Sequence, residues 1–416
     1  MQNTLVIEGG HRLAGSVRVS GAKNASLVII AASIMAHGKT VLENVPKIKD
    51  VEVLVDILKH IGVKVHWNGE GLLEVESPDN MIPETPYELS KKLRASNLLL
   101  GSLMGRMREA RICLPGGCDI GSRPMDLHLK GLQAMGAKVN LDHGFIEANA
   151  TRLQGSRVYL DFPSVGATEN IMMTAATVPG QTTIENAAKE PEIVDLANFL
   201  NAMGARIRGA GTDLIKIDGV EYLKATRYAV IPDRIEAGTF MAAATITGGD
   251  ILIENVIPTH LHPIKAKLEE TGAEITPEQG GIRVKGTGRI LPVDIKTLPY
   301  PGFPTDMQSQ MMALLSVAQG TSVIVENIFE NRLQMADEIK RMGAKIKVEG
   351  HTAVVEGVEK LNGARVKATD LRAGAALVLA ALVADGVTEI ESAQYIYRGY
   401  ERIKEKLTNL GTKVLS

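Results

Sequence analysis

Cysteine is scarce in this sequence, and neither sign of charge dominates it. The 416 residues include only two cysteines, Cys113 and Cys118, too few for a disulfide framework of the kind that stabilises small secreted domains. They also lie too close together in sequence for a bond between them to gain much from loop closure. Lys and Arg number 46 against 48 Asp and Glu, and this balance offers no general attraction to nucleic acid or to an anionic membrane. A local cluster of cations must therefore hold any anionic ligand.

Long apolar runs are also missing. The apolar runs 27–36 and 373–384 are far shorter than the roughly 20 residues that span a membrane. The first residues, MQNTLVIEGGHRLAG, lack the basic and apolar regions of a secretory signal. With 45% hydrophobic and 23% charged residues, the composition is that of a globular protein of two or three domains. We expect a cytoplasmic protein that binds neither nucleic acid nor membrane.

Six segments share one pattern, in which an amphipathic helix is followed by a glycine and a short strand. The glycines are 68 to 74 residues apart, so the repeating unit is about 70 residues long. Each glycine fits a helix C-cap, where a positive φ is cheap only without a Cβ atom. These glycines are Gly62, Gly136, Gly204, Gly272, Gly343 and Gly411.

A second pattern recurs between these segments. A helix rich in Ala, Met and Leu is followed by glycine and a strand of the form T-x-IEN, at 40–44, 183–186, 251–255 and 322–327, with a worn copy at 391–392. One repeat thus holds two helices and about four strands. This order predicts an α/β fold whose alanine-rich helices are buried against sheets. A solenoid is the alternative, although solenoid repeats are usually shorter.

The starts of the buried helices carry polar and basic residues in equivalent positions. The unpaired N–H groups of a helix start favour anions. Lys23, Arg94 and Arg372 would oppose the helix dipole unless an anion lies nearby, so they suggest a bound polyanion. The alternative is ordinary N-capping by Ser, Thr and Asp with solvated cations in the first turn.

Cys118 lies in a loop, LPGGCDIGSRP, that is rich in glycine and proline. Such a loop presents a thiol to a cleft rather than to the core. The cation of Arg123 would lower the pKa of the Cys118 thiol, whereas burial would raise it. This pattern alone allows two interpretations of Cys118, as a reactive thiol or as a small residue in a loop. Cys113, in the apolar run 112–114, reads as part of a buried strand.

The motifs together resemble a known family from end to end. They include SGAKNASL, LRASNLL, LPGGCDIGSRPMDLH, PSVGATENIMM, AKEPEIVDLANFL, IPDRIEAGTF, FPTDMQSQ, IFENR, ATDLRAGAALVLA and YRGYERI. This ordered set is similar to the bacterial UDP-N-acetylglucosamine enolpyruvyltransferases (1-carboxyvinyltransferases). The resemblance implies transfer of the enolpyruvyl group of phosphoenolpyruvate to the 3-hydroxyl of UDP-N-acetylglucosamine, the first committed step of peptidoglycan synthesis.

The resemblance also implies the architecture. The family fold is a two-domain inside-out α/β barrel of six βαβαββ units, three per domain, with the active site in the interdomain cleft. It places residues 21–231 in one domain, which carries the Cys118 loop as a lid. Residues 1–20 and 232–416 form the other domain. Closure of such a lid sequesters reactive intermediates from water.

Catalysis in the family proceeds by addition and then elimination through a tetrahedral ketal. The resemblance implies Cys118 as proton donor and as the thiol that fosfomycin alkylates, and Asp306 as the base at the sugar hydroxyl. Which steps belong to Cys118, Asp306 and Lys23 stays open. Lys23, Arg123 and Arg398 would clamp phosphoenolpyruvate, with Asn24 and Arg372 close by and Glu190 near the reacting groups.

The nucleotide sugar has its own implied contacts, which lie in several motifs. Two positions depart from some relatives: Phe162 stands where they carry a diphosphate-binding lysine, and Asp119, in place of alanine, would raise the pKa of Cys118. The implied contacts are Arg94, Arg123, Pro124, Met125, Asp126, Leu127, His128, Ser164, Val165, Gly166, Asp306, Ile328 and Phe329.

Three other interpretations compete with this one. Enolpyruvylshikimate-phosphate synthase shares the fold and the phosphoenolpyruvate chemistry but does not use a cysteine lid. A non-catalytic nucleotide-sugar sensor would not need the thiol. A thiol peroxidase would want a resolving cysteine, and Cys113 is poorly placed for that role. We expect no metal or cofactor, because His260 and His262 have no third ligand nearby in sequence and read as a helix start.

Overall fold

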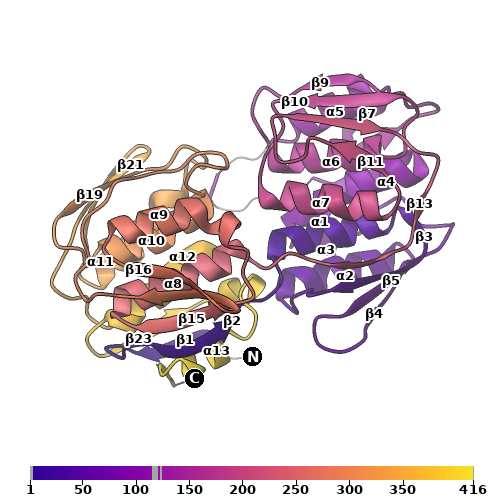
Figure 1. The fold of residues 1–416 in the computed structure, drawn as a ribbon. Helices are drawn as coiled ribbons and strands as arrows, with labels where there is room; N and C mark the ends of the chain where they lie inside the picture. Colours follow the sequence, from indigo (N-terminus) through magenta and orange to yellow (C-terminus); the bar gives the residue numbers. More distant parts are fainter. Residues whose placement is uncertain (1–2, 115–119, 122–123, 416) are drawn as a thin grey trace. The chain divides into compact units, whose positions relative to one another are not determined.

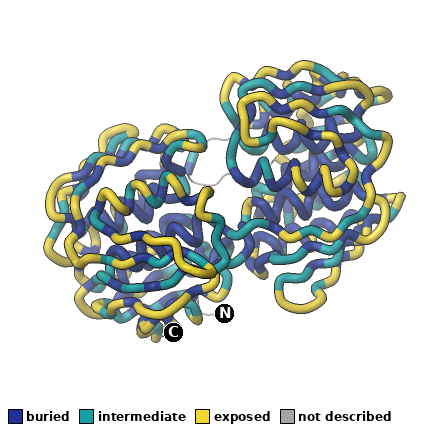
Figure 2. The backbone as a smooth tube through the Cα atoms, viewed as in Figure 1, coloured by how far each residue is buried: buried dark blue, intermediate teal, exposed yellow. Residues whose placement is uncertain are grey.

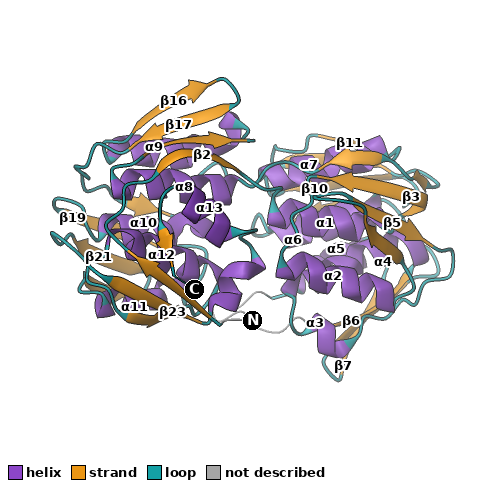
Figure 3. Ribbon diagram, turned by 90° about the horizontal axis from the view of Figure 1, so that it is seen from below, coloured by secondary structure: helices purple, strands orange, loops and turns teal. Residues whose placement is uncertain are grey.

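The computed structural model describes residues 3–114, 120–121 and 124–415, which divide into two compact units (Figure 1). Unit 1 comprises residues 3–20, 120–121 and 232–415, and unit 2 comprises residues 21–114 and 124–231. Each unit has its own hydrophobic core. Helices and strands alternate in both units (Figure 3), so the α/β class predicted from the sequence is confirmed.

Unit 2 contains three sheets in its described residues. Their strand orders are β13-β3-β5-β4 with β14 also on β3, β6-β8-β7, and β11-β12-β10-β9. The strands are β3 (Ala36–Glu43), β4 (Lys64–Trp67), β5 (Leu73–Ser77), β6 (Glu109–Cys113), β7 (Lys138–Asp142), β8 (Phe145–Asn149), β9 (Arg157–Tyr159), β10 (Gln181–Glu185), β11 (Arg206–Arg208), β12 (Leu214–Asp218), β13 (Leu223–Lys224) and β14 (Arg227–Ala229). The helices are α1 (Lys23–Ser33), α2 (Lys49–His60), α3 (Tyr87–Ser90), the 3₁₀ helix η1 (Arg94–Leu98), α4 (Leu99–Met107), α5 (Asp126–Ala134), α6 (Val165–Ala175) and α7 (Pro191–Ala202).

Unit 1 contains three four-stranded sheets in its described residues. Their strand orders are β22-β23-β1-β24, β16-β17-β15-β2 and β18-β19-β21-β20. The strands are β1 (Thr4–Glu8), β2 (Ala14–Arg18), β15 (Asp250–Glu254), β16 (Glu274–Glu278), β17 (Gly281–Lys285), β18 (Ile295–Lys296), β19 (Thr321–Val325), β20 (Lys345–Glu349), β21 (Thr352–Glu356), β22 (Arg365–Lys367), β23 (Val387–Glu391) and β24 (Lys413–Val414). The helices are α8 (Arg234–Thr247), η2 (Pro258–Leu261), α9 (His262–Glu270), η3 (Thr305–Met307), α10 (Gln308–Leu315), η4 (Arg332–Met335), α11 (Ala336–Arg341), α12 (Leu371–Val383), η5 (Ala393–Arg398) and α13 (Ile403–Asn409).

The alanine- and methionine-rich helices form the middle of each unit. Helices α1 and α6 in unit 2, and α8, α10 and α12 in unit 1, are buried along almost their whole length (Figure 2). A helix that is apolar on every side has no face to present to water. Small side chains also let neighbouring helices approach closely: a Cβ on Gly101 of α4 would lie 2.6 Å from the backbone oxygen of Asn170 in α6. The predicted burial of these helices is confirmed.

The six periodic glycines are confirmed as sites of positive φ. All six lie just after an amphipathic helix, with φ between +96° and +106°. Their amides donate to a carbonyl in the preceding turn, as in Gly136 N–H to Gln133 O at 2.9 Å. Because L side chains rarely adopt this region, glycine is the residue that ends each helix at low cost.

The asparagine of the T-x-IEN motif has a repeated structural task. Asn44, Asn186 and Asn255 have φ near +55° to +57°, and each side-chain amide donates to a carbonyl at the end of the adjacent parallel strand. The acceptors are Val230 O at 2.8 Å, Leu160 O at 2.8 Å and Val19 O at 2.7 Å. In these three copies the motif therefore ties the strand that follows the buried helix to its parallel neighbour.

In the part of the chain that the structure describes, no helix is long and apolar enough to cross a lipid bilayer.

Candidate active site

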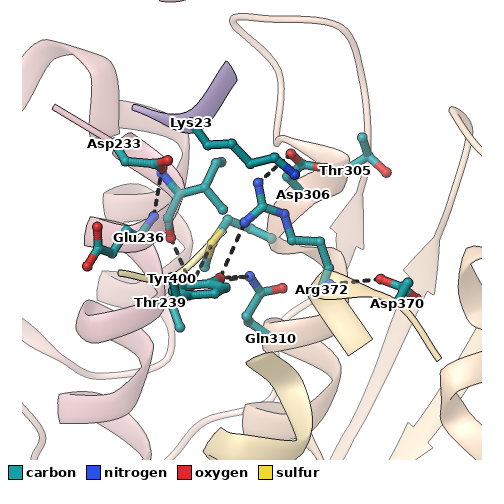
Figure 4. Close-up of polar contacts among 12 residues, drawn as sticks. Lys23, Asp233, Glu236, Thr239, Thr305, Asp306, Gln310, Asp370, Arg372 and Tyr400 are labelled. Atoms are coloured by element: carbon teal, nitrogen blue, oxygen red, sulfur yellow. Dashed lines mark hydrogen bonds and ion pairs between the residues drawn. The ribbon is translucent and has the colours of Figure 1, made fainter. Parts of the chain in front are cut away.

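A carboxylate held between two arginines is the centre of a polar cluster in unit 1. Figure 4 shows the carboxylate, Asp306, beside one of them, Arg372. Asp306 lies in η3, at the start of buried helix α10. Its Oδ2 accepts from Arg372 Nη2 at 2.8 Å and its Oδ1 faces Arg332 Nη2 at 2.9 Å. The two arginines are almost completely buried, whereas a quarter of the Asp306 side chain is exposed. The carboxylate is thus fixed in place with part of its surface open to a ligand.

Charge keeps Asp306 ionised. Burial raises the pKa of this carboxyl, but the guanidinium groups of Arg372, Arg332 and Arg234 outweigh burial and hold the pKa far below its usual range. Because the pKa in the folded chain is lower than in the unfolded chain, the stabilisation is present above the ordinary Asp value and is lost as the pH falls below it. At neutral pH, Asp306 is a carboxylate that can accept a proton.

Buried hydroxyl and amide groups orient Arg372. Its Nη1 lies 3.4 Å from the hydroxyl oxygen of Tyr400, which also contacts Thr239 Oγ1 at 2.9 Å and Gln310 Nε2 at 3.4 Å. Asp370 caps the helix that bears Arg372, since its Oδ1 accepts from the backbone N–H groups of residues 372 and 373. The guanidinium therefore has few alternative orientations.

Lys23 is paired within unit 2. It is the first residue of α1, and its Nζ lies 2.7 Å from Oδ2 of Asp50, a buried residue in the first turn of α2. Asn24 follows it and is exposed. The sequence predicted an anion beside the cations at the helix starts. For Lys23 and Arg372, the anionic partners in the structure are carboxylates of the protein itself, Asp50 and Asp306. The sequence pattern gave no means of finding these partners, which are distant along the chain.

His128, on α5, belongs to a buried amide network. Asn170 Oδ1 accepts from Gly101 N–H at 2.7 Å, so its Nδ2 donates to His128 Nδ1 at 2.7 Å and to Asn97 O at 3.2 Å. The neutral ring then carries its proton on Nε2. Burial, followed by the charge of Arg94, lowers the pKa of His128 to about 4. His128 is therefore a neutral hydrogen-bond donor at physiological pH.

This lowered pKa predicts an acid-sensitive contribution to stability. The unfolded chain binds the His128 proton near pH 6.5 and the folded chain only near 4, so this stabilisation is present above pH 6.5 and is lost as the pH falls toward 4. We expect His128→Asn, which retains an acceptor for Asn170, to flatten the fall in melting temperature between pH 7 and 5. Thermal melts of both proteins across that range measure the difference. An unchanged slope in the variant would contradict the assignment.

The start of α6 presents three residues that were predicted to contact the nucleotide sugar. Ser164 caps the helix through its Oγ, which accepts from Ala167 N–H at 3.3 Å, and Val165 and Gly166 form the first turn. A Cβ on Gly166 would lie 3.0 Å from Cε1 of His128, so the room that glycine leaves is taken by the imidazole ring. Phe162, two residues before the cap, is exposed.

Acidic side chains gather near the start of α7. Glu190 is its N-cap residue, Glu192 is buried in its first turn, and Glu169 projects from α6. Burial, and then the charges of Glu192 and Glu190, raise the pKa of Glu169 well above its ordinary value. Of these three, only Glu190 was predicted as a site residue.

The remaining predicted residues are spread over both units. Cys118 and Arg123 lie outside the described residues, as does Asp119. In unit 1, Arg398 ends η5, and Ile328 and Phe329 follow β19. In unit 2, Arg94 begins η1 rather than an α-helix, Pro124 is exposed, Met125 is buried, and Asp126 and Leu127 begin α5.

Other expectations concern the cysteine and histidine positions. Cys113 is buried at the end of β6, and His262 begins α9 with Pro263 in the first turn, as expected. Among the described residues, no group of three or more His, Cys, Asp or Glu is arranged to hold a metal ion.

Comparison with known proteins places this geometry in a class. The fold is similar to that of the enolpyruvyl transferase NikO from Streptomyces tendae, with a TM-score of 0.89 at 27% identity over 99% of this chain and 98% of that one. It also resembles EPSP synthase from Acinetobacter baumannii, with a TM-score of 0.77 at 20% identity over 99% of this chain and all of that one. The fold is that of a two-domain enolpyruvyl transferase.

Sequence similarity then gives the family. Residues 7–407 match EPSP synthase (3-phosphoshikimate 1-carboxyvinyltransferase), and the chain belongs to this family of enzymes. Two relatives are named UDP-N-acetylglucosamine 1-carboxyvinyltransferase. One, from Caldanaerobacter subterraneus subsp. tengcongensis, is 56% identical over all of this chain and 99% of its own length. The other, from Carboxydothermus hydrogenoformans, is 58% identical over 98% of each chain. The resemblance inferred from the motifs is confirmed.

Proposed function

We propose that this enzyme transfers the enolpyruvyl group of phosphoenolpyruvate to the 3-hydroxyl of UDP-N-acetylglucosamine and releases phosphate. The observation that carries the proposal is the 56–58% identity, end to end, to relatives named for this acceptor. The structures that share the fold at 20% identity support the fold alone. Enolpyruvylshikimate-phosphate synthase, the name of the matching family, is the alternative.

The reaction needs an acid, a base and cations. The sugar hydroxyl loses a proton as its oxygen bonds to C2 of phosphoenolpyruvate, and the methylene carbon gains a proton. The resulting ketal then loses a proton from its methyl group and expels phosphate, which restores the double bond. Each step moves charge, so fixed charged groups around the substrates lower the barrier.

Asp306 is the base in this proposal. It is ionised at neutral pH and fixed by Arg372 and Arg332, and a quarter of its side chain is exposed. Arg372 and Arg332 fix the position of the carboxylate. Because both arginines stabilise its ionised form, they also make it a weak base. The hydroxyl proton is therefore taken up as the new C–O bond forms, when the oxygen becomes acidic.

Cations hold phosphoenolpyruvate, and Cys118 delivers a proton to it. We assign Lys23, Arg123 and Arg398 to its phosphate and carboxylate groups, with Asn24 and Arg372 close by and Glu190 near the reacting groups. The pairing of Lys23 with Asp50 supports its share of this role, because Asp50 orients the ammonium group. In this proposal the Cys118 thiol is also the group that fosfomycin alkylates.

The nucleotide sugar lies, in this proposal, against the start of α6 and the loop after β19. Neutral His128 donates from Nε2 beside Gly166, and the positive end of the α6 dipole favours a diphosphate. The full set of contacts is Arg94, Arg123, Pro124, Met125, Asp126, Leu127, His128, Ser164, Val165, Gly166, Asp306, Ile328 and Phe329.

The finer architecture and the setting belong to the same proposal. Six sheets among the described residues and six helix-ending glycines support an inside-out barrel of six βαβαββ units. The two compact units support domains at 21–231 and at 1–20 with 232–416. We place the enzyme in the cytoplasm, at the first committed step of peptidoglycan synthesis.

Phosphate release with two acceptors tests the function. We expect release from phosphoenolpyruvate with UDP-N-acetylglucosamine, none with shikimate 3-phosphate, and complete loss after fosfomycin with a single adduct on Cys118. Release with shikimate 3-phosphate would favour the alternative. Release with neither acceptor, together with tight binding of the nucleotide sugar, would indicate a sensor that has lost catalysis.

A further inference from the structure

The fourth copy of the T-x-IEN motif differs from the others in register. In the second copy, Glu185 of β10 pairs with Tyr159 of β9, and the next residue, Asn186, donates to the next carbonyl, Leu160 O. In the fourth copy, Val325 of β19 pairs with Lys296 of β18. The asparagine that donates to the next carbonyl, Thr297 O, is Asn327, two residues further on. One residue, Glu326, is therefore extra.

The extra residue turns its carboxylate inward. In other copies, the motif glutamate lies on the outside of the sheet and pairs with an arginine of the adjacent strand: Glu43 with Arg227, Glu185 with Arg157, and Glu391 with Arg365. Glu326 is only 1% exposed. Burying a carboxylate costs free energy unless hydrogen-bond donors surround it, so the burial of Glu326 has to be explained by its contacts.

Four donors surround the Glu326 carboxylate. Its Oε1 accepts from Ile328 N–H at 2.8 Å, from Phe329 N–H at 3.1 Å and from Thr297 Oγ1 at 2.9 Å. Its Oε2 accepts from Thr305 Oγ1 at 2.9 Å. Both threonine hydroxyls donate to Glu326, and each accepts from another group. Thr297 Oγ1 accepts from Asn327 N–H at 2.9 Å, and Thr305 Oγ1 accepts from Arg332 Nη1 at 2.7 Å.

This arrangement joins two parts of the proposed site. On one side, Glu326 fixes the backbone of Ile328 and Phe329, the loop expected to meet the nucleotide sugar. On the other, Thr305 connects it to Arg332, whose Nη2 faces Asp306 and whose guanidinium carbon lies 5.1 Å from the centroid of the Phe329 ring. The hydrogen-bonded path from loop to base lies wholly within unit 1.

We propose that Glu326 is the positioning residue that couples the Ile328–Phe329 loop to the Asp306 carboxylate, so that the acceptor sugar and its base are held in one geometry. The inference deepens the proposed function and rests on it for the identity of the sugar. The register shift supports the inference independently of the substrate. The residue that is extra in this copy of the motif is the one that supplies the buried carboxylate.

The test compares Glu326→Gln with Glu391→Gln, a matched control that makes the same change at the outward-facing glutamate of another copy in the same unit. An amide cannot accept at both of its terminal atoms. We expect Glu326→Gln to raise KM for UDP-N-acetylglucosamine about tenfold, the effect of about one charged hydrogen bond, with KM for phosphoenolpyruvate nearly unchanged. The control should match the parent enzyme. Equal changes in both KM values, or in both variants, would overturn the inference.

A second readout needs no substrate. Hydrogen exchange of a peptide covering residues 327–331 should be faster in Glu326→Gln by about tenfold and unchanged in Glu391→Gln, because the Ile328 and Phe329 amides lose a charged acceptor. Unchanged exchange would overturn the positioning role. If the parent enzyme does not use UDP-N-acetylglucosamine, the proposed function fails, while this measurement still decides whether Glu326 fixes the loop.

Thr305→Val tests only the link from Glu326 to Asp306. It also replaces Glu326→Gln as the test variant if Glu326→Gln does not fold. It removes the hydroxyl between Glu326 and Arg332 and leaves the two amides capped. We expect kcat to fall about tenfold with loop exchange unchanged, since only the link toward Asp306 is broken. A kcat equal to that of the parent enzyme would overturn the coupling between loop and base.

Discussion

Replacing Cys118 with serine should abolish turnover or slow it by at least about a hundredfold. A positioned general acid contributes roughly 10²–10⁴-fold, and a serine hydroxyl is far too weak an acid to protonate the methylene carbon of phosphoenolpyruvate. Cys118→Asp keeps an acid at this position but has no sulfur for an epoxide to alkylate. We expect the aspartate variant to retain activity and to lose sensitivity to fosfomycin. Steady-state phosphate release with and without fosfomycin measures both effects.

Cys113 offers the matched control. It is the other thiol of the chain, it is buried in β6, and burial raises its pKa. Cys113→Ser should keep both activity and fosfomycin sensitivity. Full activity in Cys118→Ser would remove Cys118 from the acid role, and loss of activity in both serine variants would point to a general effect on folding.

The second large effect is expected at Asp306. Asp306→Asn removes the proposed base and leaves the buried charges of Arg372 and Arg332 without their carboxylate. We expect kcat to fall by about 10²–10⁴-fold, the range for loss of a general base. Removing one partner of a buried ion pair costs about 3–5 kcal/mol, and the partial exposure of Asp306 places the loss of stability at or below the lower figure.

An exposed ion pair in the same unit provides the comparison. Asp385 lies 2.8 Å from Lys360, and both side chains are about two-thirds exposed. Because water screens this exposed pair, Asp385→Asn should leave stability nearly unchanged and kcat unaltered. Chemical denaturation and initial rates of both variants separate the two predictions. If the Asp306→Asn variant had the same kcat as the parent enzyme, another group would have to take the hydroxyl proton.

Local patterns in the sequence predicted the repeated parts of the fold well. The periodic glycines were found because only a positive φ explains a glycine at the end of every amphipathic helix, and all six have it. The alanine-rich segments were found because a helix that is apolar on every side must be buried. Ser164, Asp233 and Asp370 cap their helices as the alternative interpretation of the helix starts requires.

Long-range partners could not be predicted in this way. Asp50 pairs with Lys23, and Tyr400 contacts Arg372, but nothing in their local sequence indicates either contact. Arg332 was visible only as part of the IFENR motif, without a role. The inward turn of Glu326 depends on a one-residue change of register between parallel strands, and the sequence alone showed the same EN pair as in other copies. Such features depend on which strands pair, which is decided by the whole fold.

The structure of the product tests the central claim most directly. The enzyme should be incubated with phosphoenolpyruvate and UDP-N-acetylglucosamine, and the product examined by NMR and mass spectrometry alongside the released phosphate. We predict one phosphate per product and a pair of vinyl protons whose ether carbon couples to the proton on carbon three of the sugar. An unmodified nucleotide sugar, or an enolpyruvyl group on another hydroxyl, would contradict the account.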